Sequence, residues 1–217
     1  MSEERPLGEG RLRTRLRGLY VIVDPETGDP VALTEAAIRG GARLLQLRDK
    51  RGTARETLRL AEAMAERARR AEVVFIVNDR LDIALAAGAD GVHLGQHDLP
   101  VAAARAIAGD RLLIGCSTNT VAEARQAVLD GADYLGVGAM FPTASKPDTR
   151  PAGIARLREI RAAVEAPIVA IGGITAANAA EVVAAGADMV AVIAAVAKAT
   201  DPEAAARALA AAIGGEG

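Results

Sequence analysis

Aromatic residues are scarce in this chain of 217 residues, which has two Tyr, two Phe and no Trp. Hydrophobic residues nevertheless make up 51% of the sequence. The core must therefore be filled with Ala, Val, Leu and Ile, which suits a fold of many close-packed helices and narrow strands. The length fits one α/β barrel better than it fits two domains.

Other absences narrow the class of protein. Cys116 is the only cysteine, so no disulfide can form within the chain. The first residues lack the apolar stretch of a secretory signal, and apolar runs such as MVAVIAAVA are far shorter than the roughly 20 residues that span a membrane. A formal net charge of −2 argues against general nucleic-acid binding. We therefore expect a cytoplasmic protein without a membrane or nucleic-acid partner.

Short apolar runs rich in β-formers alternate with helical segments rich in Ala, Arg and Glu. The runs are continuously apolar, which is typical of parallel strands that helices cover. Eight of them predict a single (β/α)8 TIM barrel, with strands over residues 19–24, 43–48, 73–78, 91–95, 112–117, 134–139, 167–172 and 189–194. An open doubly wound sheet is the alternative, but PETGDP after the first run is no dinucleotide fingerprint. We assign residues 1–17 to a short polar N-terminal arm, 18–213 to the barrel and 214–217 to a flexible tail.

A repeated Gly-Ala pair supports the barrel. It stands at residues 41, 88, 131 and 186, each time just before an even-numbered strand. Glycine takes the left-handed position that ends a helix without steric cost. The pattern therefore predicts four helices that stop at Gly and lead directly into the next strand.

Polar residues follow the predicted strands. In QLRDK, Gln46, Arg48 and Lys50 occupy every second position, which on a strand places them on one face. Active sites of such barrels lie at the carboxyl ends of the strands. We expect Arg48, Lys50 and Lys146 to form a cationic cluster at this end of the barrel, with the carboxylates of Asp79 and Asp98 among them. Such a mixture suggests a phosphate-rich substrate held by basic side chains and one Mg²⁺ ion.

A second anion site is indicated by AIGGIT and VIAAV after the last two strands, since these loops often bind phosphate through backbone N–H groups. We expect His93 to be a hydrogen-bonded barrel residue, His97 to be exposed and Cys116 to be structural. The sequence has no hydrolase triad order, zinc-ligand spacing or Walker loop.

These motifs resemble the thiamine-phosphate synthase family. The resemblance runs from about Leu19 to the last helix and rests on QLRDK, VNDRLDIALAAGADGVHLGQHDLP, GCST, FPTASK, AIGGI and VAVI. It implies a Mg²⁺-dependent transferase that joins hydroxymethylpyrimidine diphosphate to hydroxyethylthiazole phosphate, or to its carboxylated form. Diphosphate would leave first, so that the thiazole nitrogen attacks a methylene cation.

The resemblance also implies the role of each site residue. Gln46 and Ser117 would hold the pyrimidine ring. The diphosphate would be bound by Arg48, Lys50, Asn78 and Lys146, and Mg²⁺ by Asp79 and Asp98. The thiazole phosphate would be bound by Thr143, Ser145, Gly173, Ile193 and Ala194. The expected partners are these two small-molecule substrates, and a homo-oligomer is compatible with the sequence.

Three alternatives stay open at this point. A thiazole tautomerase-like isomerase would share the barrel, but it has no evident use for a metal and diphosphate cradle. A non-catalytic barrel that binds thiamine phosphate would show no turnover. A sugar-phosphate isomerase is more remote, because it would share the last two loops but not QLRDK.

Overall fold

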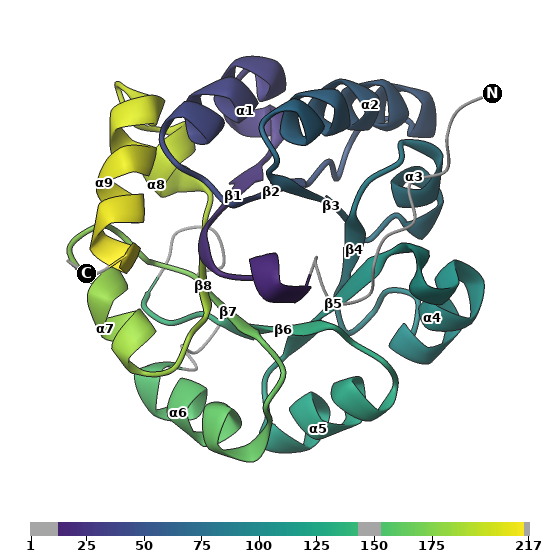
Figure 1. Cartoon of the computed structure of the whole chain (residues 1–217), viewed down its shortest axis with the longest axis vertical. Helices are drawn as coiled ribbons and strands as arrows, with labels where there is room; N and C mark the ends of the chain where they lie inside the picture. The colour runs from purple at the N-terminus through teal and green to yellow at the C-terminus, as the bar shows by residue number, and fades with distance from the viewer. Residues whose placement is uncertain (1–12, 143–152, 215–217) are drawn as a thin grey trace.

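The computed structural model describes residues 13–142 and 153–214. Its strands are all parallel and form one closed barrel, in which β1 pairs with β8 (Figure 1). The eight strands are β1 (Gly18–Val23), β2 (Leu44–Leu47), β3 (Val74–Asn78), β4 (Gly91–Leu94), β5 (Leu113–Thr118), β6 (Tyr134–Gly138), β7 (Ile168–Ile171) and β8 (Met189–Val192). The predicted barrel and its strand order are thus confirmed, with strand ends shifted by one or two residues.

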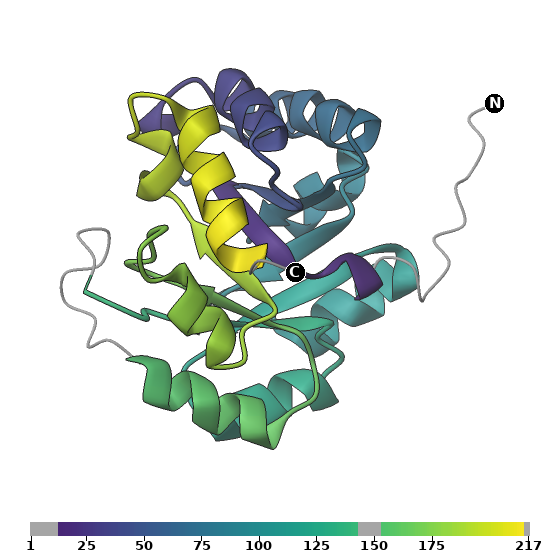
Figure 2. The ribbon, with the colours of Figure 1, turned by 60° about the vertical axis from the view of Figure 1, so that its left-hand side comes forward.

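Helices surround the barrel on its outside (Figures 1 and 2). They are α1 (Pro30–Arg39), α2 (Ala54–Arg70), α3 (Leu81–Ala86), α4 (Val101–Ala108), α5 (Val121–Leu129), α6 (Gly153–Ala163), α7 (Ala179–Ala184), α8 (Ala194–Ala197) and α9 (Pro202–Gly214). Three short 3-10 turns accompany them: η1 (Arg13–Arg15), η2 (Pro25–Thr27) and η3 (Gly109–Arg111). None of the described helices is both long and apolar enough to span a bilayer.

Alternate residues of each strand pack into two different hydrophobic clusters. In β1, Leu19 and Val21 belong to the large outer cluster between strands and helices. Tyr20 and Ile22 belong to a smaller cluster inside the barrel. Both faces of the strands are therefore buried, which explains why the runs are continuously apolar in the sequence.

The repeated Gly-Ala pair forms the predicted helix stop. The four glycines, Gly41, Gly88, Gly131 and Gly186, all have positive φ angles. In each case the backbone N–H of the following alanine donates to the carbonyl of the residue five positions earlier, as Ala89 does to the Ala84 carbonyl at 3.0 Å. This bond satisfies a carbonyl at the helix end. One local motif thus returns the chain to the barrel before β2, β4, β6 and β8.

The segment before β1 closes the barrel at the amino ends of the strands. In Figure 1, η1 lies across the centre of the ring, and Figure 2 shows it beyond one end of the strands. Leu16 is only 3% exposed and packs in the inner cluster. The sequence places this residue in a polar arm, because two leucines among arginines in RLRTRLR give no clear periodic signal.

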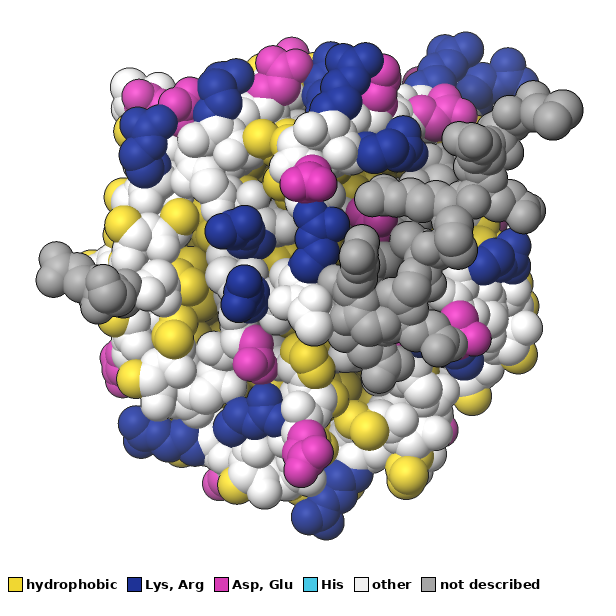
Figure 3. Space-filling model, in the orientation of Figure 1, with side chains coloured by type: hydrophobic (Ala, Val, Ile, Leu, Met, Phe, Trp, Pro, Cys, Tyr) yellow, Lys and Arg dark blue, Asp and Glu magenta, His cyan; other side chains and the backbone are white. Residues whose placement is uncertain are grey.

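Charges of both signs are interspersed over the surface in Figure 3, where Lys and Arg side chains lie beside Asp and Glu. On that face, the described side chains form no broad patch of one sign.

We predict that Leu16→Ala lowers the free energy of unfolding by about 2–5 kcal/mol, because it opens a cavity at the closed end of the barrel. Ile107→Ala is the matched control, since Ile107 is 54% exposed on α4 and its loss should cost no more than about 0.5 kcal/mol. Urea unfolding of both variants measures the difference. Equal stabilities would show that Leu16 does not close the barrel.

Candidate functional site

The polar residues predicted from the strand ends lie along one rim of the barrel. Arg48 follows β2, Asp79 follows β3, and Asp98 stands in the loop after β4. Ser117 is the fifth residue of β5. Because all eight strands are parallel, their carboxyl ends share this rim.

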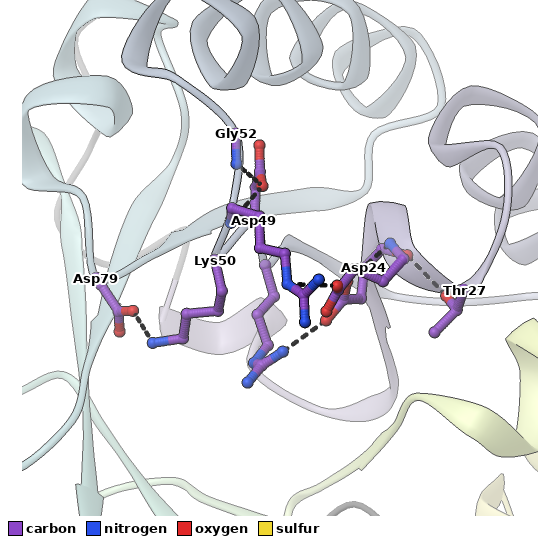
Figure 4. Close-up of polar contacts among 9 residues, drawn as sticks. Asp24, Thr27, Asp49, Lys50, Gly52 and Asp79 are labelled. Atoms are coloured by element: carbon purple, nitrogen blue, oxygen red, sulfur yellow. Dashed lines mark hydrogen bonds and ion pairs between the residues drawn. The ribbon is translucent and has the colours of Figure 1, made fainter.

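Arg48 is held by a carboxylate that the sequence analysis missed. Asp24 follows β1 and is 6% exposed, and its Oδ2 accepts from Arg48 Nη1 at 2.5 Å. Its Oδ1 accepts from the backbone N–H of Glu26 at 3.0 Å, and the Thr27 hydroxyl donates to its carbonyl (Figure 4). Asp24 comes directly after the apolar run LYVIV, so the strand-end pattern that identified Arg48 also applied to it.

Lys50 forms an ion pair with Asp79, and Figure 4 shows the two side chains pointing toward each other. Asp79 has a φ of 61°, a left-handed conformation that is uncommon for residues other than glycine. Its backbone N–H donates to the carbonyl of His93 at 2.8 Å, which anchors the turn to β4. Asp49 instead accepts from the N–H of Gly52 at 2.7 Å. In QLRDK, Arg48 and Lys50 therefore form ion pairs at the rim, whereas Asp49 stabilises the loop that follows.

Asp79 and Asp98 are close enough to influence each other's protonation. Burial raises the pKa of Asp79, and Asp98 adds to this effect while Lys50 opposes it. Burial acts in the same sense on Asp98, but hydrogen bonds with Asp79 and from the Gly95 N–H lower the pKa of Asp98 overall. Two neighbouring carboxylates repel each other unless a proton or a cation lies between them.

A chain of buried hydrogen bonds crosses the barrel interior from β2 to β5. Gln46 Nε2 donates to the Tyr20 hydroxyl at 2.7 Å, and the hydroxyls of Tyr20 and Tyr134 are 3.2 Å apart. The Tyr134 hydroxyl lies 3.1 Å from Nδ1 of His93, whose Nε2 lies 3.0 Å from Ser117 Oγ. We call these five residues the interior chain. It joins the two side chains that were predicted to hold a pyrimidine ring.

Burial shifts the titration of the interior chain. It lowers the pKa of His93 to about 4, although the charge of Asp98 opposes this shift. It also raises the pKa of Tyr20 and of Tyr134. All three side chains are therefore neutral at physiological pH. His93 is a hydrogen-bonded barrel residue and His97 is exposed, as expected.

A cavity of about 580 Å³ opens among the loops that follow β5 to β8. Its lining includes Ser117 together with Gly173, Ile193 and Ala194, so the structure brings these predicted residues together. Asn178 Nδ2 donates to the carbonyl of Gly173 at 3.1 Å and thereby braces the loop after β7.

Asn78 is the last residue of β3 and pairs with His93 in the sheet register.

Three predicted residues, Thr143, Ser145 and Lys146, lie outside the described residues. Their assignments stay predictions.

Comparisons with known proteins point to one family. A family model described as thiamine monophosphate synthase matches residues 19–196. The chain is 53% identical over 195 residues to a thiamine-phosphate synthase of Moorella thermoacetica, across 88% of this chain and 93% of the relative. A synthase of Methanoculleus marisnigri is 54% identical over 195 residues, across 88% and 92%. The solved thiamine phosphate pyrophosphorylase of Pyrococcus furiosus superposes with a TM-score of 0.88 at 41% identity, across 94% and 98%.

We predict that Gly173→Ala destabilises the cavity wall more than Gly153→Ala does. Both glycines have a φ of 69°, so both substitutions incur the left-handed backbone cost of about 1–2 kcal/mol. A Cβ at Gly173 would also lie 2.8 Å from Phe141 Cβ and from the Pro142 carbonyl oxygen, whereas at Gly153 no atom of the described residues lies within 4 Å. Thermal unfolding of the two variants measures the difference, and equal melting temperatures would contradict the close contact.

Proposed function

Since the chain belongs to the thiamine monophosphate synthase family, we propose that one half of its rim binds a pyrimidine diphosphate and the other half a thiazole phosphate. The chain condenses hydroxymethylpyrimidine diphosphate with hydroxyethylthiazole phosphate to give thiamine phosphate and diphosphate. The division of the rim, the metal and the order of steps are the parts we propose. A carboxylated thiazole phosphate is the second form of acceptor that we propose.

The observation that carries this proposal is the pair of cation and carboxylate contacts at neighbouring strand ends. Arg48 is paired with Asp24, and Lys50 with Asp79. An arriving diphosphate offers oxygens that compete with these carboxylates for the two cations. The cations are thus kept near their binding geometry before the substrate arrives, which reduces the ordering cost of binding. Asn78 and Lys146 complete the proposed diphosphate site.

Asp79 and Asp98 suit a Mg²⁺ ion by their chemistry. Mg²⁺ is usually held by one or two carboxylates together with substrate phosphates and water. No cluster of three or more His, Cys, Asp or Glu side chains suited to a metal occurs among residues 13–142 and 153–214. We propose that substrate oxygens complete the coordination of the ion. When bound there, Mg²⁺ would neutralise negative charge on the leaving diphosphate.

The reaction we propose needs no protein nucleophile. Burial raises the pKa of the Cys116 thiol to about 11, so this group is protonated at neutral pH. His93 is neutral and is engaged at both ring nitrogens. In this proposal the bond to diphosphate breaks first, with Arg48 and Lys50 bound to the leaving group. The aminopyrimidine would stabilise the methylene cation until the thiazole nitrogen attacks it, and the protein contributes alignment and electrostatic stabilisation.

We assign the thiazole phosphate to the cavity beyond β5 to β8. Gly173, Ile193 and Ala194 lie on its wall, and glycine allows the backbone of the β7 loop to approach a phosphate closely. Thr143 and Ser145 are the proposed contacts to the thiazole itself. Since the pyrimidine-binding Ser117 also lines this cavity, the two substrates would meet beside β5.

Two further assignments belong to this proposal. We propose a cytoplasmic location and allow for a homo-oligomer.

We predict that Asp79→Asn lowers kcat/KM by about a hundredfold or more, because it removes a charged Mg²⁺ ligand and the partner of Lys50. The measurement follows thiamine phosphate and released diphosphate with both substrates present, across a Mg²⁺ titration and with EDTA. Asp82→Asn is the matched control, because it replaces the same carboxylate by an amide in an exposed ion pair with Arg80. This variant should keep nearly full activity.

Wild-type turnover in EDTA, or an Asp79→Asn variant as active as Asp82→Asn, would exclude the metal site. If the wild type forms no thiamine phosphate but isomerises a thiazole carboxylate, the isomerase alternative replaces the synthase. Tight binding of thiamine phosphate without any turnover would favour the non-catalytic barrel.

A further inference from the structure

We propose that Tyr20, Tyr134 and His93 are positioning residues, which fix the hydrogen-bonding atoms that Gln46 and Ser117 present to the aminopyrimidine ring. This inference rests on the proposed function, which assigns Gln46 and Ser117 to that ring. The three residues lie between these two side chains in the interior chain. Through these three residues, the hydrogen-bonding roles of Gln46 and Ser117 are coupled.

The direction of the interior chain follows from the number of protons that it contains. The Gln46 amide nitrogen can only donate, so the Tyr20 oxygen accepts from it. The proton of Tyr20 would be stranded in the barrel core unless the Tyr134 oxygen, 3.2 Å away, accepts it. An unpaired buried donor costs about 1–3 kcal/mol, so this direction is favoured.

The same reasoning continues to the far end of the interior chain. The Tyr134 oxygen accepts from Tyr20, so its own proton goes to Nδ1 of His93. A neutral imidazole then has its proton on Nε2 and donates it to Ser117 Oγ. The remaining proton of Ser117 is directed to another acceptor. Gln46 thus offers its carbonyl oxygen to a ligand, while Ser117 offers a hydroxyl proton.

The two ends of the interior chain cannot change their roles separately. If the Gln46 amide turned over, Tyr20 would donate to its oxygen and every later bond would reverse. His93 would then have its proton on Nδ1, and Ser117 would become an acceptor toward the ligand. The His93 tautomer therefore reports which of the two patterns the site presents.

The inferred direction matches an aminopyrimidine. Its amino group donates hydrogen bonds and its ring nitrogens accept them, which complements the Gln46 carbonyl oxygen and the Ser117 hydroxyl. The corresponding oxo compound has a carbonyl in place of the amino group and an N–H on the ring, so its pattern is inverted. A site built to pair with one pattern rejects the other because buried polar groups are left unpaired.

The neighbouring strands leave room for this interior chain. A Cβ at Gly115 would lie 2.1 Å from Tyr134 Cζ and 2.6 Å from His93 Nδ1, and a Cβ at Gly136 would lie 3.0 Å from His93 Cε1. Both of the two tyrosines in the sequence belong to the interior chain. Among the described residues, no buried side-chain N or O atom lacks a hydrogen-bond partner. The interior chain is therefore a connected polar network in an otherwise apolar interior, and only its two ends are open to a ligand.

The first test reads the His93 tautomer by NMR of protein labelled with ¹⁵N-histidine. The sequence has only two histidines, and exposed His97 serves as the internal reference. We expect a single Nε2–H tautomer for His93 in the wild type. Tyr134→Phe removes the donor to Nδ1 and should give a mixture of tautomers. Tyr20→Phe should do the same, although Tyr20 makes no hydrogen bond to His93, because the direction is set through Tyr134.

The second test measures substrate discrimination. In Tyr20→Phe and Tyr134→Phe we expect the KM for the pyrimidine diphosphate to rise roughly three- to tenfold. The preference for the amino substrate over the oxo analogue, tested as a competitive inhibitor, should fall by a similar factor. The KM for the thiazole phosphate should not change. Thr34→Val is the matched control, since it removes a buried hydroxyl that donates to the Pro30 carbonyl in α1.

Three results would overturn the inference: an Nδ1–H tautomer in the wild type, a tautomer unchanged in both variants, or unchanged discrimination in folded variants. Thermal unfolding beside Thr34→Val establishes that the variants are folded. If the wild type makes no thiamine phosphate, the proposed function fails, and the tautomers alone decide whether the chain of hydrogen bonds is directional. The two failures are thus distinguishable.

Discussion

The pairing of β1 with β8 is the constraint on which the site depends. It closes the sheet, so the first and last parts of the chain become neighbours and no strand edge stays open. Because every strand is parallel, each strand delivers its following residue to the same rim. Asp24, Arg48 and Asp79 follow three successive strands that pair directly with one another. The contact between Tyr20 of β1 and Tyr134 of β6, by contrast, crosses the interior of the closed barrel. The cavity beyond β5 to β8 completes the rim.

Pairing of charges at the rim reconciles an anion site with a net charge of −2. Asp24 is nearly buried, and a buried carboxylate without its partner would be strongly disfavoured. Arg48 supplies that partner and is thereby held at the mouth. Lys50 and Asp79 repeat the arrangement at the next strand. A few oriented cations can therefore be held at the rim of a chain whose net charge is slightly negative.

Strand-end reasoning found most of the rim, because charged residues directly after apolar runs stand out in a sequence. It located Arg48, Lys50 and Asp79, and it could have located Asp24 by the same pattern. It could not find Tyr20 and Tyr134, because an aromatic residue in an apolar strand reads as core and only the structure shows where its hydroxyl points. Their hydrogen bonds join strands far apart in the sequence, and no local pattern encodes such contacts.

The interior chain is compatible with a stable barrel because most of the apolar core lies elsewhere. The outer cluster between strands and helices is much larger than the inner one, so the inner layer can contain polar groups if each is satisfied. Leu16 closes the opposite end with an apolar side chain. Gly115 in β5 and Gly136 in β6 have no side chain, which leaves room for the rings of Tyr134 and His93. Most apolar packing in the barrel thus lies between the strands and the helices, and the interior contains the hydrogen bonds that connect Gln46 with Ser117.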